Sequence, residues 1–161
     1  MESVTDQTEE TIEQPVLIER GIYKYSKQIP KELGYGIPNH YHVCVKIDDK
    51  VALLSCGTTQ HGNVASRIEY FGWKYVDIEV SSTNGFTEKT HIPCDSMFEM
   101  SQTEFDRLYQ EGMITKTGEL SEEEYQRVLE GVRQSKRMAK SNKRLVCCEP
   151  INEPINILLV C

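Results

Sequence analysis

The chain has 161 residues, of which 39% are apolar and 27% are charged, a composition typical of a soluble globular domain and not of a disordered chain. No run of apolar residues approaches the ~20 residues that a membrane-spanning helix needs, so the pattern excludes an integral membrane protein. The net charge of −7 excludes a protein that coats nucleic acid over its whole surface, but a local basic patch is still compatible with phosphate binding.

The two ends of the chain differ in composition from its centre. Residues 1–14 are acidic and lack hydrophobic periodicity, so we expect a disordered tail there. Residues 15–146 are expected to form a single domain, and residues 147–161 either a C-terminal tail or an extra strand. The N-terminus lacks the basic start and apolar run of a signal peptide, and the six cysteines form no C-x-x-C pair. We therefore expect a cytoplasmic protein with reduced thiols.

Alternating apolar and polar residues predict a strand-rich first half. The expected strands cover residues 21–25, 40–47, 51–55, part of 70–80 and residues 90–97. Loops are expected at residues 30–38 and 57–62, where glycine and proline interrupt the pattern. One face of the second strand carries the apolar residues Tyr41, Val43, Val45 and Ile47.

Two capping boxes predict two helices in the second half, at residues 101–111 and 121–135. Each begins with the pattern S-x-x-E, in which the serine and the glutamate satisfy backbone N–H groups that the helix leaves unpaired. Gly112 and Gly118 punctuate the connection, so the two helices are expected to pack as a hairpin. The expected fold class is α+β: a small SH3-like β-barrel or curled antiparallel sheet followed by a two-helix hairpin.

His42, His61 and His91 are candidates for acid–base chemistry. Imidazole exchanges protons near neutral pH, and cleavage of an RNA phosphodiester needs one group to deprotonate the 2′-hydroxyl and another to protonate the leaving oxygen. The sequence does not fix which of the three meet in the fold. A zinc site is an alternative, because His40, His42 and Cys44 alternate along one strand face. A mixed polar strand face is the simpler interpretation, and it predicts no metal and no cofactor.

Two further features bear on nucleic-acid binding. Thr58 and Thr59 offer hydroxyl groups that either hold a phosphate or cap their own turn. Six cations fall within twelve residues without an acid between them: Arg133, Lys136, Arg137, Lys140, Lys143 and Arg144. Such a run is either a solvated helix face or a phosphate-binding patch. Five aromatic residues near the strands either pack the core or stack on unpaired bases: Tyr41, Tyr70, Phe71, Trp73 and Tyr75.

The order of these segments resembles the PemK/MazF-like toxin family. The strand order and the string Ser-Cys-Gly-Thr-Thr-Gln at 55–60 are similar to the family's strands and its loop bearing a catalytic threonine. The two capped helices are similar to the tail of PemK-like relatives, so the resemblance covers about residues 20–145. It implies an SH3-like barrel with metal-independent endoribonuclease activity. The chain departs from the family where His40-Tyr41-His42 stands in place of a catalytic arginine.

We therefore expect an RNA-contacting domain that cleaves single-stranded RNA without a metal ion or cofactor. The expected catalytic residues are His42, Thr58 and Thr59. The expected RNA-binding residues are His40, His61, Arg133, Lys136, Arg137, Lys140, Lys143 and Arg144. The alternative is an inactive barrel that acts as a protein-binding adaptor or regulator of a phage or plasmid type. Its partner would be an antitoxin-like protein, a host factor or a second copy of the chain in a homodimer, and no membrane contact is expected.

Overall fold

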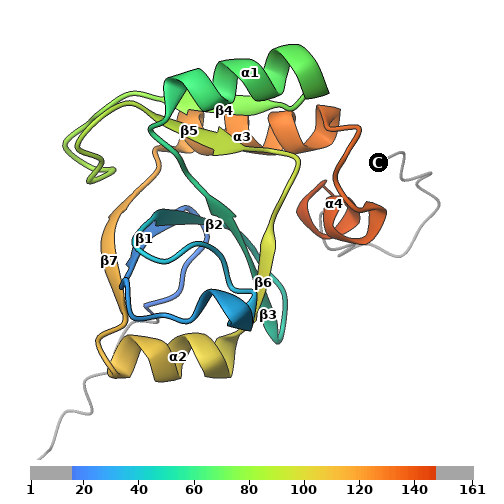
Figure 1. Ribbon diagram of the computed structural model, residues 1–161. Helices are drawn as coiled ribbons and strands as arrows, with labels where there is room; N and C mark the ends of the chain where they lie inside the picture. The colour runs from blue at the N-terminus through green and yellow to red at the C-terminus, as the bar shows by residue number, and fades with distance from the viewer. Residues whose placement is uncertain (1–15, 148–161) are drawn as a thin grey trace, which may run out of the picture.

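The computed structural model of the chain describes residues 16–147 (Figure 1). The acidic tail expected at residues 1–14 lies outside this range, and so does the tail or strand expected at residues 147–161, apart from Cys147. Within the described range, no helix combines the length and the apolar character that crossing a membrane requires.

Five antiparallel strands form the main sheet, in the order β6-β3-β2-β1-β7 (Figure 1). In chain order they are β1 (Gly21–Tyr25), β2 (Tyr41–Ile47), β3 (Val51–Cys56), β6 (Phe98–Ser101) and β7 (Ile114–Glu119). The remaining strands, β4 (Tyr75–Ile78) and β5 (Thr90–Pro93), pair with each other and form a separate two-stranded ribbon. The predicted α+β class with a curled antiparallel sheet is confirmed.

Both faces of the main sheet are buried, because each is covered by a helix. Alternation along β1 places Ile22 on one face and Tyr23 on the other, and both side chains are fully buried. The Ile22 face packs against α3 (Glu122–Gln134) and the ribbon, and the Tyr23 face packs against α2 (Gln102–Gln110). Figure 1 shows α3 and the ribbon above the sheet and α2 below it.

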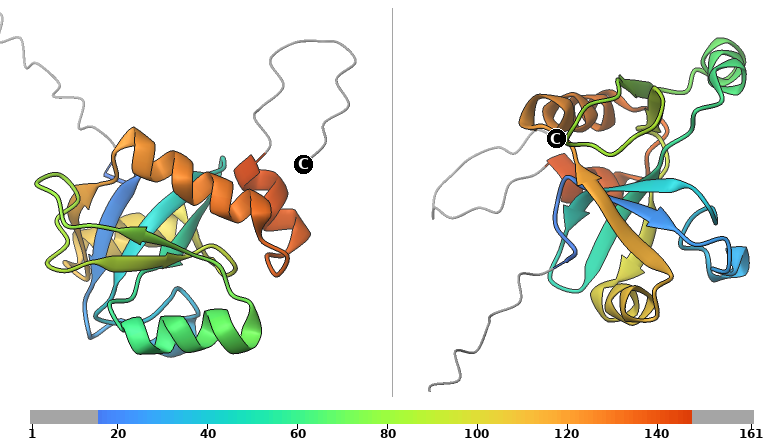
Figure 2. Two further views of the ribbon diagram at one scale, coloured as in Figure 1. Left: turned by 90° about the horizontal axis from the view of Figure 1, so that it is seen from above. Right: turned by 90° about the vertical axis from the view of Figure 1, so that its left-hand side faces the viewer.

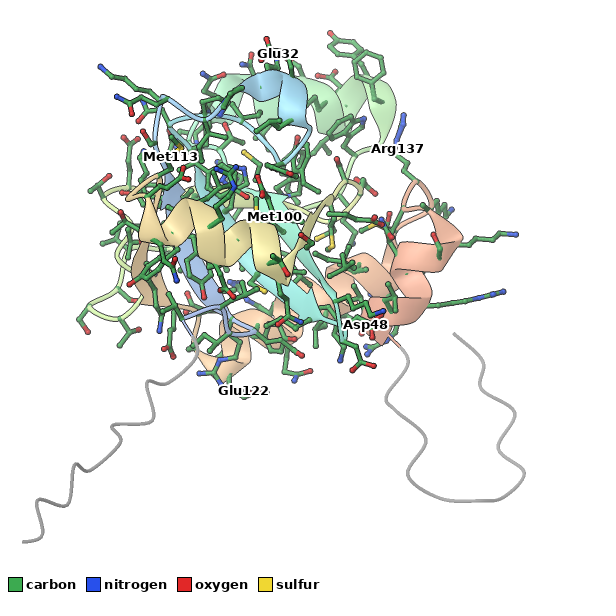
Figure 3. All side chains as sticks on the ribbon, turned by 90° about the horizontal axis from the view of Figure 1, so that it is seen from below. Glu32, Asp48, Met100, Met113, Glu122 and Arg137 are labelled. Atoms are coloured by element: carbon green, nitrogen blue, oxygen red, sulfur yellow. The ribbon has the colours of Figure 1, made fainter. Side chains whose placement is uncertain are left out.

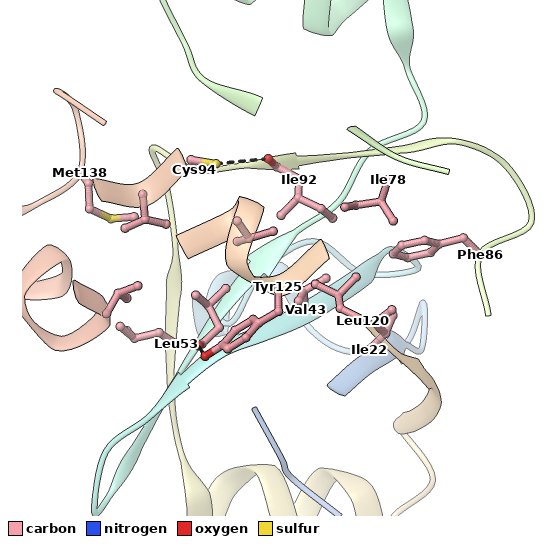
Figure 4. Packing of buried hydrophobic residues seen from close by; sticks show 14 residues of the cluster. Ile22, Val43, Leu53, Ile78, Phe86, Ile92, Cys94, Leu120, Tyr125 and Met138 are labelled. Atoms are coloured by element: carbon pink, nitrogen blue, oxygen red, sulfur yellow. Dashed lines mark hydrogen bonds between the residues drawn. The ribbon is translucent and has the colours of Figure 1, made fainter. Parts of the chain in front are cut away.

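The core between the sheet, the ribbon and α3 holds the ribbon in place (Figure 4). Ile78 and Ile92 point from the ribbon into this core, and both are fully buried. Tyr125 of α3 donates its hydroxyl proton to the carbonyl oxygen of Val45, at 2.8 Å. Gly131 lets α3 approach the end of β5, since a Cβ atom there would lie 2.4 Å from Cys94 Sγ. The face of the ribbon that carries Ile78 and Ile92 is therefore buried against this core.

Both predicted helix starts are confirmed. Ser101 Oγ accepts from the N–H of Glu104 at 3.1 Å, and Ser121 Oγ accepts from the N–H of Glu124 at 3.1 Å. Glu124 completes its capping box by accepting from the N–H of Ser121 at 2.9 Å. The predicted helical hairpin is wrong, however. The connection between the helices contains β7, which forms one edge of the sheet. As a result, α2 and α3 lie on opposite faces of the sheet.

A bulge in β2 changes which face its last residues occupy. Tyr41, Val43 and Val45 belong to the core beneath α3, as the alternation predicts. Ile47 instead packs with the core beside α2. The pairing of β2 with β3 shifts between Cys44 and Lys46, and the extra residue reverses the alternation.

Two helices lie in segments that were not predicted to be helical. The first, α1, covers His61–Phe71, and the second, α4, covers Lys140–Cys147. A short 3-10 turn, Lys31–Leu33, lies inside the predicted loop at 30–38. Only Val64 of α1 is buried. The right-hand view of Figure 2 shows α1 standing away from the main sheet.

Candidate active site

Two histidines and an aspartate form a hydrogen-bonded chain between the ribbon and α1. Asp77 of β4 lies directly opposite His91 of β5, and Asp77 Oδ1 is 2.5 Å from His91 Nδ1. His91 Nε2 is hydrogen-bonded to Nδ1 of His61, the first residue of α1. His91 is 6% exposed, whereas His61 is exposed to solvent. The chain therefore runs from a carboxylate through a buried imidazole to an imidazole at the surface.

An ionised Asp77 and a neutral His91 together set the direction of the hydrogen bonds in this chain. An ionised carboxylate can only accept, so Nδ1 of His91 carries a proton and donates it to Asp77. Nε2 of neutral His91 is then an acceptor, and Nδ1 of His61 donates to it. The remaining nitrogen, Nε2 of His61, keeps its lone pair. This is the arrangement of a general base whose positive charge, once a proton is taken up, is stabilised through His91 by Asp77.

Thr58 lies beside His91 because their backbones pair. The N–H of Thr58 donates to the carbonyl of His91 at 3.0 Å, and the N–H of His91 donates to the carbonyl of Thr58 at 2.8 Å. Residues directly opposite in an antiparallel pair project to the same side, so the Thr58 side chain projects on the same side as His91. Thr58 Oγ1 also accepts from the N–H of Gln60 at 3.2 Å.

Two cavities meet at Thr58. The aromatic cavity, about 230 Å³, has Arg67, Trp73, Tyr75 and Phe98 in its wall. The polar cavity, about 340 Å³, has Lys24, Asn39, Thr59, Thr87 and Thr90 in its wall. Both cavities are also lined by His40, Gly57, Thr58 and Gln60. The predicted residues Thr58 and His40 therefore stand at the boundary between them, and Thr59 lines the polar cavity.

His40 is oriented by one hydrogen bond and has one nitrogen free for other partners. Its Nδ1 lies 2.9 Å from the carbonyl oxygen of Pro38, and a carbonyl can only accept, so Nδ1 carries a proton. The second ring nitrogen of His40, Nε2, has no hydrogen-bond partner among residues 16–147. Since His40 lines both cavities, this nitrogen is placed where it can serve a bound molecule.

His42 does not have the access that its predicted catalytic role requires. Its side chain is fully buried and its ring stacks on Tyr25, with 3.6 Å between the ring centroids. Nε2 accepts from the N–H of Ile37 at 3.2 Å, and Nδ1 lies 3.2 Å from the carbonyl of His40. Burial lowers the pKa of His42 from 6.5 to about 3, so the ring stays neutral. We therefore exclude His42 from the candidate site.

The zinc alternative is not supported by the positions of its three residues. His42 and Cys44 share a strand face as predicted, but that face packs against the core beside α2. Burial raises the pKa of the Cys44 thiol well above its usual range, which disfavours the thiolate that a metal needs. Across residues 16–147 there is no cluster of three histidine, cysteine or acidic side chains that could hold a metal ion.

Of the six cations predicted to bind RNA, Arg133 lies at the end of α3, Lys136 and Arg137 lie in the turn after it, and the other three lie on α4. Arg133 is paired with Glu130, and Lys143 Nζ donates to the carbonyl of Ser135 at 2.8 Å. Arg137 lies against Trp73, a residue of the aromatic cavity's wall, since its guanidinium carbon is 5.7 Å from the centre of the Trp73 ring. The basic run therefore approaches the candidate site through Arg137.

Asp77 and Arg67 were missed in the sequence. Asp77 did carry a signal, because it is the one acidic residue in the apolar segment Tyr75–Ile78 and so belongs to the strand face away from the core. Arg67 carried no such signal, since its helix was not predicted.

No protein-family model matches this chain, and no curated protein or solved structure matches it either.

Proposed function

We propose that the protein cleaves single-stranded RNA without a metal ion, by attack of a ribose 2′-hydroxyl on the adjacent phosphate. The observation that carries the proposal is the chain Asp77–His91–His61, which leaves Nε2 of His61 as an unshared base at the surface. The proposal agrees with the resemblance to PemK/MazF-like toxins, but it uses residues that the resemblance did not point to.

The reaction needs one proton acceptor and one proton donor. Nε2 of His61 takes the proton of the 2′-hydroxyl as the 2′-oxygen forms its bond to phosphorus. The bond between phosphorus and the 5′-oxygen then breaks, and protonated His40 delivers its Nε2 proton to that oxygen. The products are a 2′,3′-cyclic phosphate and a free 5′-hydroxyl. His91 and Asp77 stabilise the charge that forms on His61.

Arg67 and Thr58 are the groups suited to the phosphate itself. A guanidinium keeps its charge at every working pH, so it can stabilise the extra negative charge on phosphorus in the transition state. One nitrogen of Arg67 donates to the Tyr75 hydroxyl at 3.1 Å, which leaves other N–H groups for the ligand. Arg67 can thus supply the positive charge that the catalytic arginine supplies in the PemK/MazF-like family, where this chain has His40-Tyr41-His42 instead.

A defined single-stranded RNA, incubated with the protein in EDTA and followed by mass spectrometry, tests the proposal. We expect fragments ending in 2′,3′-cyclic phosphate and 5′-hydroxyl, and none with His61→Ala. Asp77→Asn should lower the cleavage rate by ~10²- to 10⁴-fold, because the imidazolium loses its stabilising charge. Glu79→Gln is the matched control, since Glu79 is an exposed carboxylate that contacts Lys89 but neither histidine. RNA that stays intact, or equal losses in the Asp77 and Glu79 variants, would refute the proposal.

One observation favours the alternative, a protein-binding adaptor. Three large apolar side chains of α1 are exposed to solvent: Ile68 (49%), Tyr70 (73%) and Phe71 (62%). Ile68 and Phe71 are three residues apart and therefore lie on the same side of the helix. Exposed apolar side chains of this size are typical of a protein-binding surface, in a homodimer or with another protein. Sedimentation velocity over a range of concentrations tests the homodimer. Self-association that Phe71→Ser removes would support it, and a monomer at every concentration would exclude it.

A further inference from the structure

Trp73, the single tryptophan of the chain, lies between side chains from three different segments. The guanidinium carbon of Arg67, on α1, is 5.3 Å from the centre of its ring. That of Arg137, in the turn between α3 and α4, is 5.7 Å away. The Tyr75 ring, on β4, is inclined by only 18° to the Trp73 ring, with 6.2 Å between centroids. Two cations and two nearly parallel aromatic rings thus meet at one place.

Three members of this cluster, Arg67, Trp73 and Tyr75, line the aromatic cavity, and Arg137 lies beside Trp73. Trp73 and Tyr75 are both half-buried there, and Arg67 lies beside them. The remaining wall combines apolar Phe98 and Pro93 with polar Ser96 and Gln60. Flat rings, guanidinium groups and a few hydrogen-bonding side chains are the combination that binds an unpaired nucleobase by stacking.

Free positive charge continues from the cavity along α4. Among residues 16–147, no carboxylate lies within ion-pair distance of Lys136, Arg137, Lys140 or Arg144. All four side chains are exposed. Figure 3 shows Arg137 between the end of α1 and α4. Lys136 adjoins Arg137 in the sequence, and Lys140 opens α4, so further cations stand close to Arg137 along the chain. Such a line of cations suits the phosphates of an extended strand.

We propose that the aromatic cavity binds one unpaired base of a single-stranded nucleic acid, stacked on Trp73 and held by Arg67 and Arg137. The phosphates that follow this base lie over Lys136 and Lys140. A base in a duplex is stacked on both sides and cannot present a free face to Trp73, so duplexes are excluded from this subsite. The inference rests on the proposed function in that the subsite would hold RNA beside Thr58, although binding itself requires no cleavage.

Trp73 provides its own reporter, because all tryptophan fluorescence of the protein comes from this one residue. We would titrate the protein with a 2′-O-methyl hexauridylate, which lacks the nucleophile and therefore stays uncut. Stacking should quench the fluorescence, and the corresponding duplex should quench it far less. A labelled copy of the oligonucleotide, followed by anisotropy, then measures the affinity of variants that lack the tryptophan.

Trp73→Leu should weaken binding of the single strand by ~10- to 100-fold, the usual effect of removing one stacking ring. Tyr70→Leu is the matched control, since Tyr70 is an exposed aromatic residue of the same region that lies outside the cavity wall. Lys140→Gln should weaken binding and reduce the slope of log affinity against log salt by about 0.7. Circular dichroism checks that each variant is folded.

Two results would overturn the inference: equal affinities for single strand and duplex, or equal affinities of the Trp73 and Tyr70 variants. The stacking subsite and the proposed cleavage can be refuted independently of each other. A protein that binds the uncut oligonucleotide but leaves RNA intact refutes cleavage alone. A protein that cleaves RNA equally well with and without Trp73, and binds the oligonucleotide equally well, refutes the stacking subsite alone.

Discussion

Acidification should destabilise the fold through the buried imidazole of His42. Its pKa falls from 6.5 to about 3 on folding because burial penalises the charged ring. Between these two values the unfolded chain binds a proton that the folded chain does not, so stability is lost as the pH decreases. Between pH 7 and pH 5 the linkage relation gives a loss of about 2 kcal/mol of unfolding free energy from this single group. This loss of stability changes little for any folded-state pKa of His42 below about 4.

The variant His42→Gln isolates this contribution. A glutamine cannot be protonated in this range, and its amide oxygen can still accept from the N–H of Ile37. Urea unfolding followed by circular dichroism at pH 7, 6 and 5 gives the unfolding free energy of both proteins. All other titrating groups are common to the two proteins. From pH 7 to pH 5 the unfolding free energy of the variant should therefore rise by about 2 kcal/mol relative to that of the wild type. Parallel curves would show that His42 is not buried as a neutral ring.

Three further substitutions test the fold and the choice of catalytic group. Ser121→Ala should lower the unfolding free energy by ~1 kcal/mol, measured in urea, because the capping box at the start of α3 is lost. Gly36→Ala should lower the melting temperature, since Gly36 has φ 132 and a Cβ atom there would lie 2.2 Å from His42 Nε2. Cys56→Ser should leave RNA cleavage within a few-fold of wild type, because burial raises the pKa of this thiol to about 11 and keeps it protonated. Loss of cleavage in that variant would point to a thiolate nucleophile.

The strands and the two capped helices were predictable because their signals are local. Alternation over a few residues identified β1, β2 and β3, and a serine followed by a glutamate marked the starts of α2 and α3. The helix α1 carried neither kind of signal. Gln60 precedes it without a side-chain cap, and only Val64 is buried, so no apolar stripe appears along it.

The error over His42 has a different physical origin. In the sequence, an alternating strand with histidines on one face suggests that this face meets solvent. Here the second face of the sheet is covered as well, by α2, and the loop at Gly36 and Ile37 closes over the ring. Whether one face or both are covered depends on where distant helices pack, and β7 decides that by separating α2 from α3.

The ribbon of β4 and β5 explains why the site forms where it does. Its alternation gives Ile78 and Ile92 to the core beneath α3, where Gly131 allows close packing. The same alternation turns Asp77 and His91 to the opposite face, toward α1, in register with each other. A packed core on one side therefore holds Asp77 and His91 at hydrogen-bonding distance on the other, which preorganises the pair that supports the general base His61. His61 is the member of this arrangement that the core does not hold, because α1 has a single buried side chain and its first residue is exposed.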